Sequence, residues 1–185
     1  ERPAVERENF PLDNYNDYHI TKAFEDHLSK HKEDLFFYAI GFRKPHLPFA
    51  APEKFWELYN KSEIKISEFG NAPINGDTII YQWSELAAYQ GYDKNYFETN
   101  YRNIKVRDEE AKDLSHGYLA SISFIDELVG RLVNTLKKHD LEKNTIIVFM
   151  SDHGFHLGDQ QIWGKHSSYE NSTHTPLIIV DPSNT

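Results

Sequence analysis

Residues 145–154 read Thr-Ile-Ile-Val-Phe-Met-Ser-Asp-His-Gly, six apolar or β-branched residues followed directly by polar ones. β-Branched side chains favour strands, and an unbroken apolar run is typical of a strand buried on both faces of a parallel sheet. A second run of this kind, Leu-Phe-Phe-Tyr-Ala-Ile-Gly-Phe, covers residues 35–42. The two runs predict buried strands of a largely parallel sheet.

Two stretches have the periodicity of amphipathic helices. In residues 17–31 apolar side chains recur at helical spacing, and Asp17 is a candidate N-cap. Residues 108–139 give the clearest pattern, with an apolar stripe that includes Ile122 and extends to Leu136. Helices that alternate with buried strands indicate an α/β fold in which the helices cover the faces of the sheet.

The remaining stretches are shorter or polar. A short helix is expected over residues 52–59, and one or two helical turns over 83–89. Residues 91–106 are a long connection rich in Tyr and Asn, typical of a functional loop. A third apolar run covers residues 177–180. We find no internal repeat and no linker between domains.

Composition excludes several classes of protein. The 185 residues carry a net charge of −9, which disfavours nucleic acid and anionic membranes as partners. No apolar run approaches the ~20 residues of a membrane span. The chain has no Cys, so these residues hold no disulfide, thiolate zinc site or Cys nucleophile. It opens at Glu1 and closes just after an apolar run, so we expect a piece of a longer protein.

The candidate ligand site lies where the predicted strands end. Ligands of α/β sheets bind at the carboxyl ends of the strands, and loops 43–49 and 151–166 both begin there. Asp152 and His153 follow the strand directly, and both side chains can bind a divalent cation. On spacing alone, an Asp that caps a turn beside a surface His explains the pair equally well.

Two more residues of these loops suit an anionic substrate. His46 lies between two prolines that stiffen its loop, which makes it a candidate general acid. Lys165, between Gly164 and His166, could bind an oxyanion as a point charge. Taken singly, a structural His46 and a solvated Lys165 remain open alternatives. His156, Asp159, Glu170 and His174 are interpreted as loop residues.

The loops together are more specific than any one of them. The segments that carry the resemblance are Lys44-Pro45-His46-Leu47-Pro48-Phe49, Ser151-Asp152-His153-Gly154, Trp163-Gly164-Lys165 and Thr175-Pro176-Leu177. From about Asp17 to Val180 the chain resembles the sulfatase family, and within it the iduronate-2-sulfatase-like group. The resemblance implies an alkaline-phosphatase-like α/β/α sandwich, of which residues 1–185 would be the C-terminal part of the catalytic domain.

The resemblance also implies residue roles. Asp152 and His153 match ligands of a divalent cation, usually calcium, while Lys165 and His46 match residues that bind the sulfate and assist the leaving oxygen. An imidazole is unusual for calcium, so another metal, or His153 in contact with the substrate, stays open. The family's nucleophile is a formylglycine made from Cys or Ser, and no matching motif occurs in this chain. The nucleophile is therefore expected upstream.

These implications lead to one functional hypothesis and two alternatives. We expect a sulfuric ester hydrolase acting on a sulfated glycan, of which a uronic acid 2-sulfate is one candidate. The alternatives are a phosphate or phosphonate ester hydrolase of the same superfamily and a non-catalytic sulfatase fragment. The expected partners are a sulfate ester and the remainder of the same catalytic domain. The family implies a periplasmic, secreted or lysosomal location.

Overall fold

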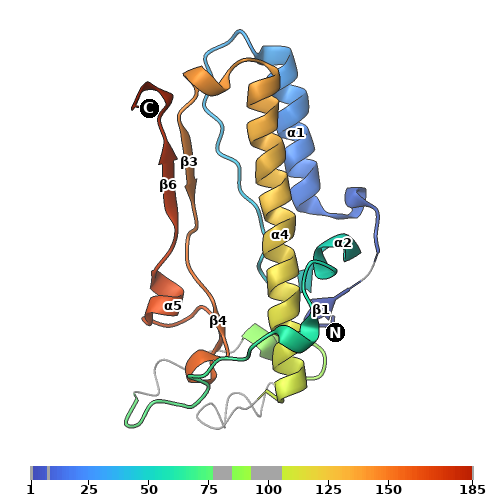
Figure 1. Ribbon diagram of the computed structural model, residues 1–185, viewed down its shortest axis with the longest axis vertical. Coiled ribbons are helices and arrows are strands. Elements are labelled where there is room, and N and C mark those ends of the chain that lie inside the picture. The colour runs from blue at the N-terminus through green and yellow to red at the C-terminus, as the bar shows by residue number, and fades with distance from the viewer. Residues whose placement is uncertain (1, 8, 77–84, 93–105, 185) are drawn as a thin grey trace.

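The computed structural model describes residues 2–7, 9–76, 85–92 and 106–184 (Figure 1). The helices are α1 (Asn16–His31), α2 (Glu53–Trp56), α4 (Asp108–Lys138) and α5 (Glu170–Thr173). The strands are β1 (Val5–Glu6), β2 (Phe49–Ala50), β3 (Ile147–Met150), β4 (His156–Leu157), β5 (Trp163–Gly164) and β6 (Leu177–Val180). Short 3-10 turns cover Leu12–Asn14, Lys61–Glu63, Glu85–Ala88, Glu142–Asn144, Asp159–Gln161 and Pro182–Asn184. None of the described helices combines the length and hydropathy that crossing a membrane requires.

Helix α4 is the central element, and α1 lies along it (Figure 1). The predicted helices 17–31 and 108–139 are confirmed within a residue or two. The predicted apolar stripe is partly wrong, because Ile122 is exposed. The buried face of α4 is instead the one that carries Gly117. A Cβ on Gly117 would lie 2.8 Å from Cβ of Phe49 and 2.9 Å from the Trp56 ring. Strand β2 and helix α2 therefore pack on this face of α4.

Asp17 does not cap α1 as predicted. The N-cap is Tyr15, which makes no side-chain capping bond. The buried Asp17 carboxylate instead accepts hydrogen bonds from the backbone amides of Arg43, at 2.7 Å, and Lys44, at 3.1 Å. The start of α1 is thus tied to the loop that carries His46.

Three strand pairs are found in the described residues. Strands β1 and β2 pair in parallel, whereas β3 pairs with β6, and β4 with β5, in the antiparallel direction. Residues 35–42 are extended, but they form no strand ladder with another described segment. One side of this segment packs against α1 and α4 through Phe36, Tyr38 and Ile40.

The predicted burial of the apolar runs is wrong for this chain. Leu35 and Phe37 are fully exposed, and nearly every side chain of the ribbon formed by β3 and β6 is exposed as well. No described layer covers this ribbon, which stands beside α4 (Figure 1). Residues 35–42 and β3 both run down toward the lower end of the molecule in this view. Loops 43–49 and 151–166 follow these two segments in the chain, although no described ladder joins the two segments into one sheet.

Candidate active site

The two predicted catalytic residues, His46 and Lys165, meet at the carboxylate of Glu85. Oε1 of Glu85 lies 2.8 Å from Nζ of Lys165 and 3.7 Å from Nε2 of His46. Nε2 of His166 lies 3.6 Å from the same oxygen. Residues from three separate segments of the chain therefore place their side chains together, with three nitrogen atoms around one oxygen of a carboxylate.

The loop of His46 is held at several points. The backbone amide of His46 donates to the carbonyl of Arg43 at 3.0 Å, which closes a turn. The Lys44 ammonium donates to the carbonyls of His46, at 3.3 Å, and Pro48. Burial lowers the pKa of Lys44 to about 8. Nδ1 of His46 lies 2.7 Å from the carbonyl oxygen of Leu47, which leaves Nε2 turned toward Glu85.

Lys165 follows β5, which is fixed by its pairing with β4. The residue before Lys165, Gly164, packs against Glu85, because a Cβ on Gly164 would lie 3.6 Å from Cγ of Glu85. His156 in β4 is fully buried, its Nε2 is 3.0 Å from the Ser167 hydroxyl, and burial lowers its pKa. The interpretation of His156 as a loop residue is therefore wrong, because it is a buried residue of β4.

Asp152 and His153 lie side by side after β3. Oδ2 of Asp152 is 3.7 Å from Nε2 of His153, and the Asp152 side chain is 87% exposed. Nδ1 of His153 is 2.7 Å from the Gly154 carbonyl oxygen, so an N–H there leaves the Nε2 lone pair free. Their hydrogen bonds and ion pairs run to each other and to the adjoining loop rather than to Glu85.

These two residues fit a divalent cation as part of a ligand set. Two atoms 3.7 Å apart can both reach one ion at the usual ~2.0–2.6 Å ligand distances. No group of three or more His, Asp or Glu able to hold a metal occurs among the described residues. The remaining ligands of such a site would have to come from elsewhere.

Gly154 completes the Asp-His-Gly motif through a close approach. Its amide donates to the Ser172 carbonyl at 2.8 Å, and a Cβ here would lie 2.1 Å from the carbonyl oxygen of Asn171. Because no side chain fits between Gly154 and α5, the motif needs glycine here for space. The exposed pair Glu170 and His174 lies at the end of this contact and makes only a local ion pair.

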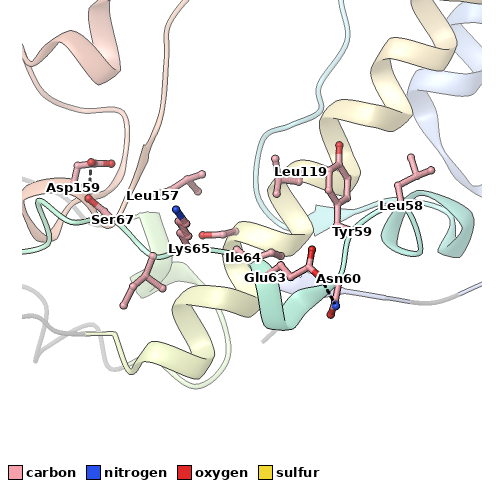
Figure 2. Close-up of a pocket in the computed structure, with 12 residues that line it drawn as sticks. Leu58, Tyr59, Asn60, Glu63, Ile64, Lys65, Ser67, Leu119, Leu157 and Asp159 are labelled. Atoms are coloured by element: carbon pink, nitrogen blue, oxygen red, sulfur yellow. Dashed lines mark hydrogen bonds between the residues drawn. The ribbon is translucent and has the colours of Figure 1, made fainter.

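A pocket of about 550 Å³ lies between residues 58–67, α4 and the 151–166 loop (Figure 2). The Ser67 hydroxyl donates to Asp159 at 2.7 Å and joins two of these walls. None of the four predicted site residues belongs to the described lining. The pocket is therefore separate from the cluster formed by Glu85, His46, Lys165 and His166, called the Glu85 cluster below.

Sequence reasoning missed Glu85 and gave His166 no role. Glu85 lies in a polar stretch without a motif, and only its place beside the apolar Leu86 on a short turn marks it. His166 adjoins Lys165, so its position could have been noticed. Tyr89 lies near the cluster, and its pKa is raised by burial and by the charge of Glu85.

The chain is similar to known proteins over most of its length. The family model described as Sulfatase matches residues 1–185. The chain belongs to the sulfatase family. Two sulfatase relatives are human iduronate 2-sulfatase and the choline-sulfatase of Rhizobium meliloti (strain 1021). The first is 34% identical over 81% of this chain and the second 34% identical over 77%. The matched regions cover only 27% and 26% of these relatives, so the chain spans about a quarter of their length.

Solved structures show the fold of this sulfatase chain. The phosphonate monoester hydrolase SpPMH from Silicibacter pomeroyi has a TM-score of 0.74, with 24% identity, over 94% of this chain and 34% of its own. The phosphonate monoester hydrolase of Agrobacterium radiobacter has a TM-score of 0.71, with 22% identity, over 96% and 35%. The predicted fold class, an α/β chain of the alkaline-phosphatase-like type, is confirmed.

Proposed function

We propose that the full-length protein containing this chain is a sulfuric ester hydrolase and that residues 1–185 are the C-terminal part of its catalytic domain. The observation that carries the proposal is the convergence of His46 and Lys165 on one carboxylate oxygen. Groups that gather around a carboxylate can also gather around the oxygens of a sulfate ester. The family membership supports sulfate as the anion, and the name of one relative, iduronate 2-sulfatase, supports a sulfated glycan with a uronic acid 2-sulfate.

The roles follow from the chemistry of each side chain. Lys165 would offset the charge that develops on the sulfuryl oxygens, which stabilises the transition state. His46 would give a proton to the leaving oxygen, since it is part-exposed and can reach a substrate. The nucleophile, a formylglycine in this family, would come from a segment outside these residues.

Asp152 and His153 would supply part of a divalent cation site. When bound, such a cation polarises the ester oxygens as a Lewis acid. Asp152 would offer a carboxylate oxygen, and His153 would offer Nε2 while Nδ1 is held by the Gly154 carbonyl. We propose calcium as the ion, and loading the metal-free protein with calcium, magnesium or manganese would decide between them.

Turnover of an aryl sulfate by the full-length protein tests the proposal. We expect His46→Ala and Lys165→Ala each to lower kcat by about 100-fold or more without unfolding the protein. His19→Ala and Lys54→Ala are matched controls on the exposed surface and should leave kcat unchanged. Wild-type kcat in both site variants would refute these roles.

A second candidate function is phosphate or phosphonate ester hydrolysis. The two phosphonate monoester hydrolases share the fold of this chain, and a Lys–His cluster does not by itself distinguish sulfate from phosphate. Aryl sulfate and aryl phosphonate should therefore be compared at equal concentration. A higher kcat/KM for the phosphonate would favour this alternative, and no turnover of either would favour a non-catalytic protein.

The location is also a proposal. Sulfatases of this family lead us to propose a periplasmic, secreted or lysosomal protein. Fractionation of the source cells with an antibody against the chain would test it, and a purely cytosolic signal would overturn it.

A further inference from the structure

The carboxylate of Glu85 lies behind the groups that would meet the substrate. Its side chain is only 4% exposed, whereas the side chains of His46 and His166 are 36% and 47% exposed and that of Lys165 is 15% exposed. The imidazoles can therefore reach a ligand on the open side. Glu85 contacts the same residues from the interior.

The two oxygens of Glu85 have different environments. Oε1 lies near all three nitrogen atoms, whereas Oε2 is buried and has no hydrogen-bond partner among the described residues. The backbone of Gly164 packs against this side of Glu85, where a Cβ would lie 3.7 Å from Oε2. Burying a carboxylate oxygen without a hydrogen bond costs free energy of folding, and an apolar side chain would fill the same space without that cost. The presence of Glu85 here therefore points to a role in the site.

We propose that Glu85 is a positioning residue that acts through Lys165, His46 and His166, an inference that rests on the proposed sulfatase function. A lysine side chain has many rotamers, and an ion pair at 2.8 Å restricts where its ammonium lies. Holding the ammonium and imidazoles in place before the substrate binds lowers the entropy cost of reaching the transition state. The same negative charge repels an anionic substrate, so Glu85 weakens ground-state binding.

These two effects have opposite kinetic consequences in Glu85→Gln. Glutamine keeps the shape but removes the charge. We expect kcat to fall about 10- to 100-fold, the loss typical of residues that orient a catalytic group. We expect KM for an aryl sulfate to fall as well, because the repulsion is removed. A mere loss of folded protein would lower kcat and leave KM unchanged.

Three further variants complete the experiment. Glu25→Gln breaks the Glu25–Arg131 ion pair between α1 and α4, and it should lower the melting temperature without changing KM. Glu85→Asp keeps the negative charge but moves the carboxylate away from Lys165 by the length of one methylene group. The ammonium is then held less firmly, so kcat should fall, whereas KM should not fall because the repulsion of the substrate remains. If Glu85→Gln does not fold, Glu85→Asp carries the test. In Glu85→Gln/Lys165→Gln, the fall in kcat relative to Lys165→Gln should be smaller than the fall that Glu85→Gln causes in the wild type, since part of the effect of Glu85 passes through the Lys165 ammonium.

Binding of inorganic sulfate separates this inference from the proposed function. Calorimetry on the full-length protein should show tighter sulfate binding by Glu85→Gln than by the wild type, whether or not an ester is hydrolysed. Absent turnover in the wild type would refute the sulfatase proposal alone. Unchanged kcat and unchanged sulfate affinity in Glu85→Gln would overturn the role of Glu85, as would a rise in kcat.

Discussion

The carboxylate of Asp17 holds the backbone of Arg43, with Oδ1 accepting from the Arg43 amide at 2.7 Å. Asp17 is buried in the first turn of α1, and its second oxygen accepts from the amide of Lys44 at 3.1 Å. Helix α1 in turn packs along α4 through Phe24 and Leu28. The Asp17 side chain therefore ties the loop that carries His46 to α1, in addition to the packing of Leu47 against α4.

Replacing Asp17 should affect both stability and activity. An asparagine side chain at this position could accept from only one of the two amides, because its other terminal atom is an NH₂ donor. Asp17→Asn should therefore lower the free energy of unfolding by about 1.5–3 kcal/mol, the range for hydrogen bonds to charged groups. It should also lower kcat, because one of the contacts that hold the loop of His46 in place is lost. Urea unfolding and aryl sulfate turnover of the full-length protein measure the two effects. Asp26→Asn, which breaks only an exposed pair with Lys22, is the control and should change neither.

The helices could be predicted from sequence because their signal is local. The periodicity of residues 17–31 and 108–139 depends on spacing within each helix, and both helices form where expected. Ile122 shows the limit of this approach. Which side of α4 is buried depends on Gly117, whose missing side chain admits Phe49 and Trp56, and spacing alone does not contain that information.

The site could be predicted only in part, because spacing along the chain does not show which distant residues come into contact. His46 and Lys165 could be selected because their loops follow predicted strands, and the structure places both at Glu85. Glu85 itself lies in no motif, and its importance comes from contacts with residues far away in the chain. Asp17 had a sufficient local explanation as a helix cap, which hid its long-range bonds to the backbone of the His46 loop.

Gly117 and Gly130 lie in the same helix and predict opposite effects of alanine. In Gly117→Ala the new methyl group meets Cβ of Phe49 at 2.8 Å, so α4 and β2 must separate. We expect the free energy of unfolding to fall by about 1–3 kcal/mol. No atom lies within 4 Å of a Cβ at Gly130. There the better helix propensity of alanine should raise stability by about 0.5–1 kcal/mol. Equal effects in urea unfolding would contradict this packing.

Lys44 should make stability depend on pH in the alkaline range. Burial lowers its pKa from the ordinary 10.5 to about 8, so the folded protein releases this proton first. Below pH 8 both states keep the proton, and the cost of burying the charge is fully present. Between pH 8 and 10.5 the unfolded chain binds more protons, so the free energy of unfolding should rise, by at most about 3 kcal/mol.

Lys44→Met removes the titrating group and should flatten the pH dependence of urea unfolding in that window. Lys138 is exposed at the end of α4, so Lys138→Met is the control and should keep the wild-type slope. If Lys44→Met keeps the same slope as the wild type, Lys44 is protonated in the folded protein throughout this range.

The exposed ribbon of β3 and β6 predicts opposite effects in the isolated chain and in the full-length protein. Val148 and Ile179 face each other across the ribbon, and both are exposed. A two-stranded ribbon with exposed apolar side chains is marginal alone and prone to association. Under the proposal that the remainder of the catalytic domain covers it, Ile179→Lys should improve the solubility of the 185-residue chain. The same change should destabilise the full-length protein, where a buried lysine is unpaired.

Light scattering and binding of a hydrophobic dye measure the first effect, and urea unfolding measures the second. Ile74, a highly exposed apolar residue away from the ribbon, gives the control, and Ile74→Lys should leave the stability of the full-length protein unchanged. A full-length protein that tolerates Ile179→Lys as well as Ile74→Lys would show that the ribbon stays open to solvent. The sandwich would then not close over these strands, and residues 1–185 would not be part of a continuous catalytic core.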